Sequence, residues 1–214
     1  FCFFSLFYTF AKKNAVEEQI IQKGIELFVK YGFKSVTMDD ISGPLGISKK
    51  TLYDYFKNKE SLVKNCVERR LLEITDKIFK IQQASENPIV ELYQIKKEVL
   101  KHLGNDSSAP QYQLQKFYPS IYSYLKDKEI QMMGNMFKDS LQRGIEMKLF
   151  REHINLDFVT RIYFNGIRGI RNINLFPIEL YKIDELMSSF FEYHLRAIST
   201  TKGLELLETI KKIK

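Results

Sequence analysis

The 214-residue sequence contains no tryptophan, two cysteines and three histidines. Cys2 and Cys66 give no disulfide framework, which favours a reducing, cytoplasmic setting. His102, His153 and His194 are scattered without the spacing of metal ligands, so we predict no metal site. A glycine-rich phosphate loop, a nucleophile elbow, HExxH and CxxC are all missing. These absences argue against an enzyme and against a bound cofactor.

Long hydrophobic runs and alternating strand patterns are also missing. No segment reaches the ~18 apolar residues that a membrane-spanning helix needs, so we predict no membrane partner. Hydrophobic residues make up 44% of the chain and recur at helical spacing, as at Ile20, Ile21, Ile25 and Phe28. The sequence therefore predicts an all-α fold. Beyond residue 88 we expect helices at about 89–103, 111–125, 128–148, 156–175, 183–199 and 203–213, with a loop at 104–110.

The N-terminus is an atypical apolar extension, residues 1–13. It opens with FCFFSLFYTF and does not begin with methionine. A secretory signal peptide carries positive charge before its apolar region, whereas Lys12 and Lys13 follow it here. The extension is a misassigned start or a cloning remnant, an apolar strap packed on the first domain, or a surface contact. The two lysines could also form a basic arm over a phosphate backbone.

Residues 37–62, TMDDISGPLGISKKTLYDYFKNKESL, indicate two short helices joined by a tight turn. Thr37 is a good N-cap with Asp40 as its capping-box partner, so the first helix should run to about Leu45. Gly46 ends it, and Ser48 caps a second helix at about 49–56. Within 46–59 four lysines accompany one aspartate. This layout is typical of a helix-turn-helix, which places its second helix in the DNA major groove.

The head of the chain resembles the DNA-binding domain of TetR/AcrR-family transcriptional regulators. The resemblance implies a helix-turn-helix domain at 14–60 and a helical ligand-binding and dimerisation domain at 61–214. The matching positions are Ile25, Phe28, Gly32, Phe33, Thr37, Ile41, Leu45, Gly46, Ile47, Ser48, Thr51, Leu52, Tyr53, Tyr55, Phe56, Lys57, Asn58, Lys59, Glu60 and Leu62.

The resemblance also implies which residues contact DNA. Lysine can donate to guanine O6 or N7 or to a phosphate, and a tyrosine hydroxyl can reach a phosphate. Ser48 is first a cap, and lysines on a surface helix are often simply solvated. The candidate DNA-binding residues are Thr37, Ser48, Lys49, Lys50, Thr51, Tyr53, Tyr55, Lys57 and Lys59.

One departure from the family pattern lies inside this motif. The family usually continues as a regular helix after Ile41, but this chain has Ser42-Gly43-Pro44. Proline lacks an N–H and disfavours helical angles in the residue before it. We therefore expect Gly43 to leave the helical region, and the first helix to end early or bend.

The body carries an apolar and aromatic cluster that could line a small-molecule pocket or form an ordinary core. Methionine suits such a pocket because it adapts to varied ligand shapes. Arg168 could bind an anionic ligand or pair with an acid such as Glu185 or Glu192. The candidate pocket residues are Phe117, Tyr118, Tyr122, Met132, Met133, Met136, Phe137 and Arg168.

A second body segment predicts a helix–helix contact. Gly166 and Gly169 lie three residues apart, near one helix face, and favour close packing by another helix. Aromatic and aliphatic residues on the next helix could complete a dimer interface. The candidate interface residues are Gly166, Gly169, Ile170, Phe190, Phe191 and Leu195.

Together with the resemblance, these patterns favour a homodimeric transcriptional regulator, a repressor, that binds a pseudo-palindromic double-stranded DNA operator. A small apolar or amphipathic effector of unknown identity would release it. Two other classes compete. One is a ligand- or protein-binding helical module with a degenerate helix-turn-helix, supported by Gly43-Pro44 and by Asp54. The other is an enzyme on a helical scaffold, which no motif supports.

Overall fold

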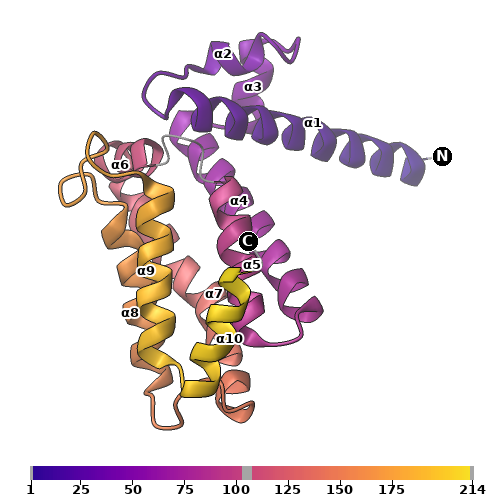
Figure 1. Ribbon diagram of the computed structural model, residues 1–214. Helices are drawn as coiled ribbons and strands as arrows, with labels where there is room; N and C mark the ends of the chain where they lie inside the picture. Colours follow the sequence, from indigo (N-terminus) through magenta and orange to yellow (C-terminus); the bar gives the residue numbers. More distant parts are fainter. Residues whose placement is uncertain (1, 103–107, 213–214) are drawn as a thin grey trace. The chain divides into compact units, whose positions relative to one another are not determined.

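The computed structural model describes the backbone of residues 2–102 and 108–212, and the side chains of 15–101, 110 and 112–211. The expected extension at 1–13 therefore lies outside the described side chains. Within the described residues the fold is all-α, with one isolated antiparallel bridge between Phe150 and Ser199. The helices are α1 (Cys2–Tyr31), α2 (Met38–Ser42), α3 (Lys49–Tyr55), α4 (Lys59–Ala84), α5 (Pro88–His102), α6 (Ser108–Phe117), α7 (Pro119–Glu146), α8 (Leu156–Ile170), α9 (Ile183–Ile198) and α10 (Thr201–Lys212) (Figure 1).

The predicted helices at 111–125 and 128–148 were wrong in their boundaries. In the structure α6 instead ends at Phe117 and α7 begins at Pro119. Helix α7 then continues without interruption to Glu146. Proline at the first position of a helix costs no hydrogen bond, because that N–H has no partner inside the helix. Pro119 therefore begins a helix here, and its starting signal was missed.

By its contacts the chain divides into two units: Phe1–Leu72 with Gln113–Ser123, and Glu73–Tyr112 with Tyr124–Lys214. We call them the head unit and the body unit. In the head unit α1 and α4 meet where Gly24 faces Cys66, whose thiol donates to the Ile21 carbonyl at 3.5 Å. A Cβ on Gly24 would stand 2.7 Å from that sulfur, so glycine permits this close approach.

In the body unit α8 and α9 run side by side, and α10 packs along α5 (Figure 1). A polar cluster lies inside it. Glu91 is fully buried, and its carboxylate accepts from Ser140 and pairs with Arg143. Breaking such a buried pair leaves an uncompensated charge, so the cluster constrains how α5 meets α7.

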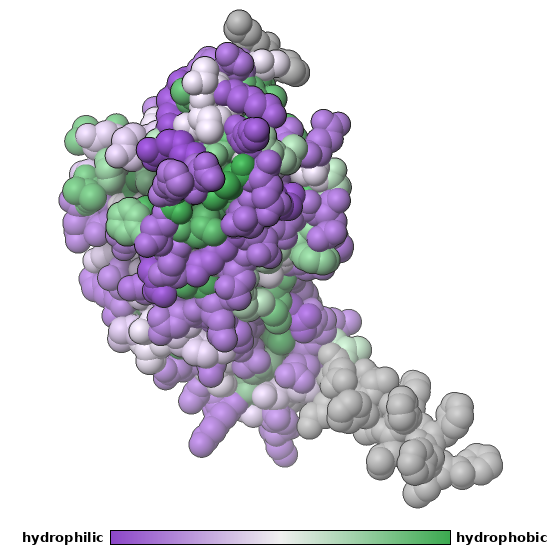
Figure 2. Space-filling view, turned by 90° about the horizontal axis from the view of Figure 1, so that it is seen from below, coloured by the Kyte–Doolittle hydropathy of each residue, from purple (hydrophilic) through white to green (hydrophobic). Residues whose placement is uncertain are grey.

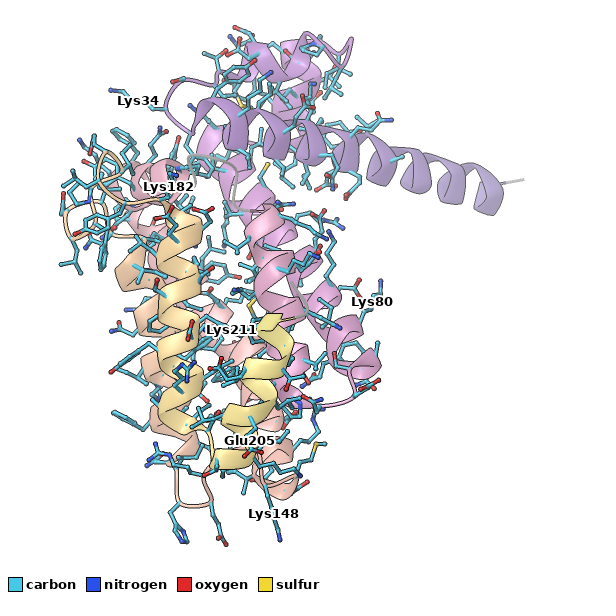
Figure 3. The ribbon with its side chains drawn as sticks, in the orientation of Figure 1. Lys34, Lys80, Lys148, Lys182, Glu205 and Lys211 are labelled. Atoms are coloured by element: carbon cyan, nitrogen blue, oxygen red, sulfur yellow. The ribbon has the colours of Figure 1, made fainter. Side chains whose placement is uncertain are left out.

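A chain of ion pairs ties α9 to α10. Glu192 accepts from Arg196 on its own helix and from Lys211 on α10, and Arg196 also pairs with Glu208. Lys211 is labelled in Figure 3. These contacts lower the pKa of Glu192, chiefly through the bond from Lys211. The last helix is thus anchored by charge as well as by the buried Leu207.

The face drawn in Figure 2 is largely hydrophilic, with smaller hydrophobic areas between the polar groups. Among the described helices, none combines the length and the apolar character needed to cross a bilayer.

Candidate nucleic-acid interface

Helices α2 and α3 and the start of α4 form a helix-turn-helix in the head unit. Ile41 of α2 and Leu52 of α3 are completely buried, and Phe56 is 3% exposed just after α3. Because an amphipathic surface helix buries one side and exposes the other, these anchors decide which residues of α3 face outward. The outward side of α3 carries Lys50 and Tyr53.

Thr37 and Asp40 form the predicted capping box at the start of α2. The Asp40 carboxylate accepts from the Thr37 backbone N–H and from its hydroxyl, both at 2.7 Å. The Thr37 oxygen in turn accepts from the Asp40 N–H at 3.2 Å. The bond from the Thr37 backbone is the main reason that the pKa of Asp40 is lowered. The Thr37 hydroxyl is therefore engaged in the helix cap.

Ser48 caps α3 as predicted. Its hydroxyl oxygen accepts from the Thr51 N–H at 3.0 Å, and the two side-chain hydroxyls lie 2.8 Å apart. A hydrogen bond between these hydroxyls orients both at the N-terminus of α3, the second helix of the helix-turn-helix, which we call the recognition helix. Both residues are thus held by local contacts in this structure.

The expectation that Pro44 would displace Gly43 from helical angles was wrong. Gly43 has φ −56° and ψ −58°, and its N–H donates to the Asp39 carbonyl at 3.0 Å. The clash between a proline ring and the preceding residue falls partly on that residue's Cβ, which glycine lacks. Helix α2 does end early, at Ser42, and the turn closes at Gly46 with φ +64°.

Lys49, the first residue of α3, is held by an acid of α2. Its ammonium lies 2.8 Å from Asp39 Oδ2, and about half of each side chain is exposed. The bond to Asp39 is the main reason that the pKa of Lys49 is raised. The first lysine of the recognition helix is therefore half of an ion pair.

Lys59 stands at the start of α4, beside the turn that leaves α1. Its ammonium donates to the Lys34 carbonyl at 3.3 Å, and burial lowers its pKa. Asn58 caps α4, since its side-chain oxygen accepts from the Ser61 N–H at 2.8 Å. Lys34 lies on the turn between α1 and α2 (Figure 3).

The nine candidate DNA-binding residues all lie in the head unit, but their exposure differs. Thr51, Tyr55 and Lys59 are half-buried. The remaining six are exposed: Thr37, Ser48, Lys49, Lys50, Tyr53 and Lys57.

Sequence reasoning missed two partners of this surface. One is Asp39, which holds Lys49 from ten positions away. The other is Gln113, whose side-chain oxygen accepts from the Lys34 N–H at 3.1 Å across 79 positions. The acid beside the lysine-rich helix was a visible signal for the first. No local pattern marks the second.

The candidate pocket residues fall into both units. In the head unit the Phe117 ring lies beneath the ammonium groups of Lys34 and Lys116, at 5.3 and 5.6 Å. The Tyr118 ring meets Phe33 edge-on, with centroids 6.2 Å apart, and burial raises its pKa. Phe117 and Tyr118 therefore cover the turn after α1. Tyr122 follows on α7.

The other candidate pocket residues lie in the body unit. Phe137 stacks on Tyr163 at 4.4 Å with an interplanar angle of 8°. Arg168 pairs with Glu129 at 2.8 Å, so its acid is on α7 and is neither Glu185 nor Glu192. Met132 and Met136 are half-buried and Met133 is buried.

The candidate dimer residues are largely packed against other residues of the same chain. Ile170, Phe191 and Leu195 are 9%, 3% and 1% exposed. The Phe190 ring covers Gly166, where an added Cβ would stand 2.2 Å from it, whereas a Cβ on Gly169 would meet nothing within 4 Å. The close helix contact that the glycines predicted is thus between α8 and α9 of the same chain. A buried face is not free for a second copy.

Metal and redox chemistry find no support in the described part of the chain. No group of His, Cys, Asp or Glu side chains there could hold a metal ion. Burial raises the pKa of the Cys66 thiol to about 12, which keeps it protonated at neutral pH and unreactive as a nucleophile.

The family model of bacterial regulatory proteins, tetR family, matches residues 20–66. The HTH-type transcriptional repressor KstR2 of Mycobacterium tuberculosis is 25% identical over 152 residues, which cover 69% of this chain and 76% of the relative.

Solved structures share the fold. A transcriptional regulator from Cytophaga hutchinsonii superposes with a TM-score of 0.72 at 21% identity, over 86% of this chain and 98% of that one. SmeT, the repressor of a Stenotrophomonas maltophilia multidrug efflux pump, was solved in complex with triclosan. That complex gives a TM-score of 0.65 at 16% identity, over 87% of this chain and 93% of the other.

Proposed function

We propose that this chain is a repressor whose operator binding responds to a small molecule. The proposal starts from its family: the chain belongs to the tetR family of bacterial regulatory proteins, and is thus a DNA-binding transcriptional regulator and not an enzyme. The observation that carries the proposal is α3. It is capped by Ser48, anchored by Leu52 and turns lysine and tyrosine side chains outward.

The DNA-binding residues take different roles in this proposal. Lys50, Tyr53 and Lys57 are exposed and reach phosphates or base edges. Thr51 and Tyr55 stand at the margin of the contact, and Lys59 adds positive charge beside a phosphate at the start of α4. Thr37 and Ser48 chiefly hold their helices in place.

The regulator would act as a homodimer. A two-fold dimer presents two recognition helices to successive major grooves roughly 34–36 Å apart, and so binds a pseudo-palindrome. We propose that the dimer face is the exposed side of α8 and α9. Phe158, Ile162 and Tyr193 are 61%, 46% and 72% exposed there. These three replace the buried residues as candidates.

The effector would be small and apolar or amphipathic, and would bind in the body. The support is a body unit rich in aromatic rings and a fold shared with SmeT, which was solved with triclosan. By linkage, an effector that weakens operator binding must itself be bound less tightly by the operator-bound protein.

Selection of bound fragments from a random DNA pool, followed by binding isotherms at several salt concentrations, tests DNA recognition. Lys49→Ala should change which base is preferred at one position of the half-site. Lys59→Ala should weaken all sequences alike and flatten the slope of log K against log salt by about one. Lys80→Ala, on the body part of α4, is the matched control. Unchanged affinity in both head variants would refute the docking.

A further inference from the structure

The ion pair between Asp39 and Lys49 places an acceptor and a donor side by side at the DNA-reading end of α3. Lys49 Nζ and Asp39 Oδ2 are 2.8 Å apart. About half of each side chain is exposed, 55% for Lys49 and 62% for Asp39. After this contact Lys49 still has N–H donors to spare, and Asp39 has a second oxygen. The pair is therefore able to bind a third group without separating.

The two neighbouring aspartates of α2 are held in different ways. Asp40 turns back to the N-terminus of its own helix and is occupied by Thr37. Asp39 is held through Lys49 and stays open to solvent. An exposed carboxylate repels DNA phosphates, and while paired it also cancels the charge of Lys49. The pair thus adds almost nothing to the sequence-independent attraction that positive charge provides.

A G·C base pair offers the complementary arrangement in the major groove. Guanine presents its O6 and N7 acceptors, and cytosine presents its N4 donor. Guanine O6 and cytosine N4 are hydrogen-bonded to each other, and such bonds are typically about 2.9 Å long. Nζ and Oδ2 have nearly the same separation, so the ion pair can lie alongside that bond and meet both groups at once.

We propose that Asp39 is a specificity-determining residue that reads one G·C base pair of each half-site together with Lys49. Asp39 accepts from cytosine N4 while Lys49 donates to guanine O6 or N7, and the ion pair stays closed. This inference rests on the proposed function, because it assigns a base contact within that same surface. Its consequence is that the pair raises specificity and not general affinity.

The test uses the operator selected by the full-length wild-type protein and a panel of duplexes with one base pair changed at each position. In wild type, replacing the G·C pair read by Asp39 and Lys49 should cost about tenfold in affinity. Asp39→Ala, which removes both the charge and the acceptor, should reduce that penalty to less than threefold and leave the penalties at other positions unchanged. It should also bind unrelated DNA about three- to tenfold more tightly, with a salt slope steeper by about one.

Three further variants keep the test decisive. Asp76→Ala removes an acid paired with Lys80 on the body part of α4 and should change none of these values. In Lys49→Met and in Asp39→Ala/Lys49→Met the penalty at the G·C position should equal that of Asp39→Ala, since the two side chains act as one reader. Thermal unfolding of Asp39→Ala checks that the head remains folded.

The outcomes separate the inference from the proposed function. If wild type selects a palindrome but Asp39→Ala keeps the full penalty at every position, the base-reading role is overturned and the regulator stands. An equal change at all positions means that Asp39 is only a repelling charge, which also overturns the role. If wild type selects no DNA at all, both proposals fall.

Discussion

At the scale of single residues, His194 is a buried polar side chain with an unsatisfied ring nitrogen. It is 6% exposed, and its Nε2 has no hydrogen-bond partner among the described residues. Its neighbours are aromatic: the Tyr163 ring lies 4.8 Å away, Phe190 6.0 Å and Phe137 6.1 Å. Burial among these rings lowers its pKa from 6.5 to about 4, because a charged imidazole would lose its hydration there.

The pKa of His194 predicts that the folded protein loses stability on acidification. Between pH 6.5 and about 4, His194 is protonated in the unfolded chain but stays neutral in the folded chain. The free energy of unfolding therefore falls as the pH falls, by at most about 1.4 kcal/mol per pH unit and about 3 kcal/mol in all. Urea unfolding at pH 7.5 and pH 5 measures this.

His194→Phe should remove this part of the pH dependence, because the variant has no imidazole to titrate. His153→Phe is the control, since His153 is exposed. Carboxylates titrate in all three proteins and cancel in the comparison. Identical pH dependence in wild type and His194→Phe would contradict the assignment.

At the scale of elements, α8 shows how two glycines one turn apart serve different purposes. Gly166 makes room for the Phe190 ring of α9. Gly169 has open space where its side chain would be. Glycine inside a helix costs about 0.5–1 kcal/mol relative to alanine, so Gly169 weakens α8 without a packing gain in the chain.

Alanine at these two positions should therefore act in opposite directions. Gly166→Ala should destabilise the protein by about 1–3 kcal/mol, because its methyl group collides with the Phe190 ring. Gly169→Ala should stabilise it by about 0.5–1 kcal/mol. Chemical denaturation of both variants gives the two signs. Destabilisation by Gly169→Ala would mean instead that a second chain packs against that position.

The helix caps of the head could be predicted from sequence because they are local. Thr37 with Asp40, Ser48 with Thr51, and Asn58 with Ser61 each span three positions, within reach of a turn signal. The resemblance supplied the candidate residues, but it said nothing of their partners.

Contacts between distant segments could not be predicted in the same way. Gln113 accepts from Lys34 across 79 positions. Arg168 pairs with Glu129, although Glu185 and Glu192 are nearer in sequence. Composition marked Phe117 and Phe191 as apolar, but a pocket, a core and a dimer face share that composition. Only their neighbours in three dimensions distinguish these roles.

At the scale of the whole molecule, dimerisation would decide whether the protein binds a complete operator tightly. One helix contacts only a half-site, so affinity for a palindrome depends on a second copy. The exposed side of α8 carries Phe158 and Ile162, four residues apart and thus neighbours on one helix face.

Ile162→Arg should convert the proposed dimer to a monomer, because it introduces a charge into an apolar interface. Sedimentation velocity should show the lower mass, and operator affinity should drop while weak binding to unrelated DNA remains. Phe79→Arg, at an exposed position of α4, should leave the dimer intact. A dimer that persists in Ile162→Arg, or a monomeric wild type, would rule out this face.

The contact between Gln113 and the turn after α1 also limits how the head can be moved to another protein. The Gln113 side chain lies over Gly32, which has φ +80° and no room for a Cβ, while Tyr118 covers Phe33. A chimera built from residues 1–72 alone would strip this cover and leave the Lys34 N–H without its acceptor. A transplantable head is therefore discontinuous, and a graft that keeps its native turn must carry residues 113–123 as well.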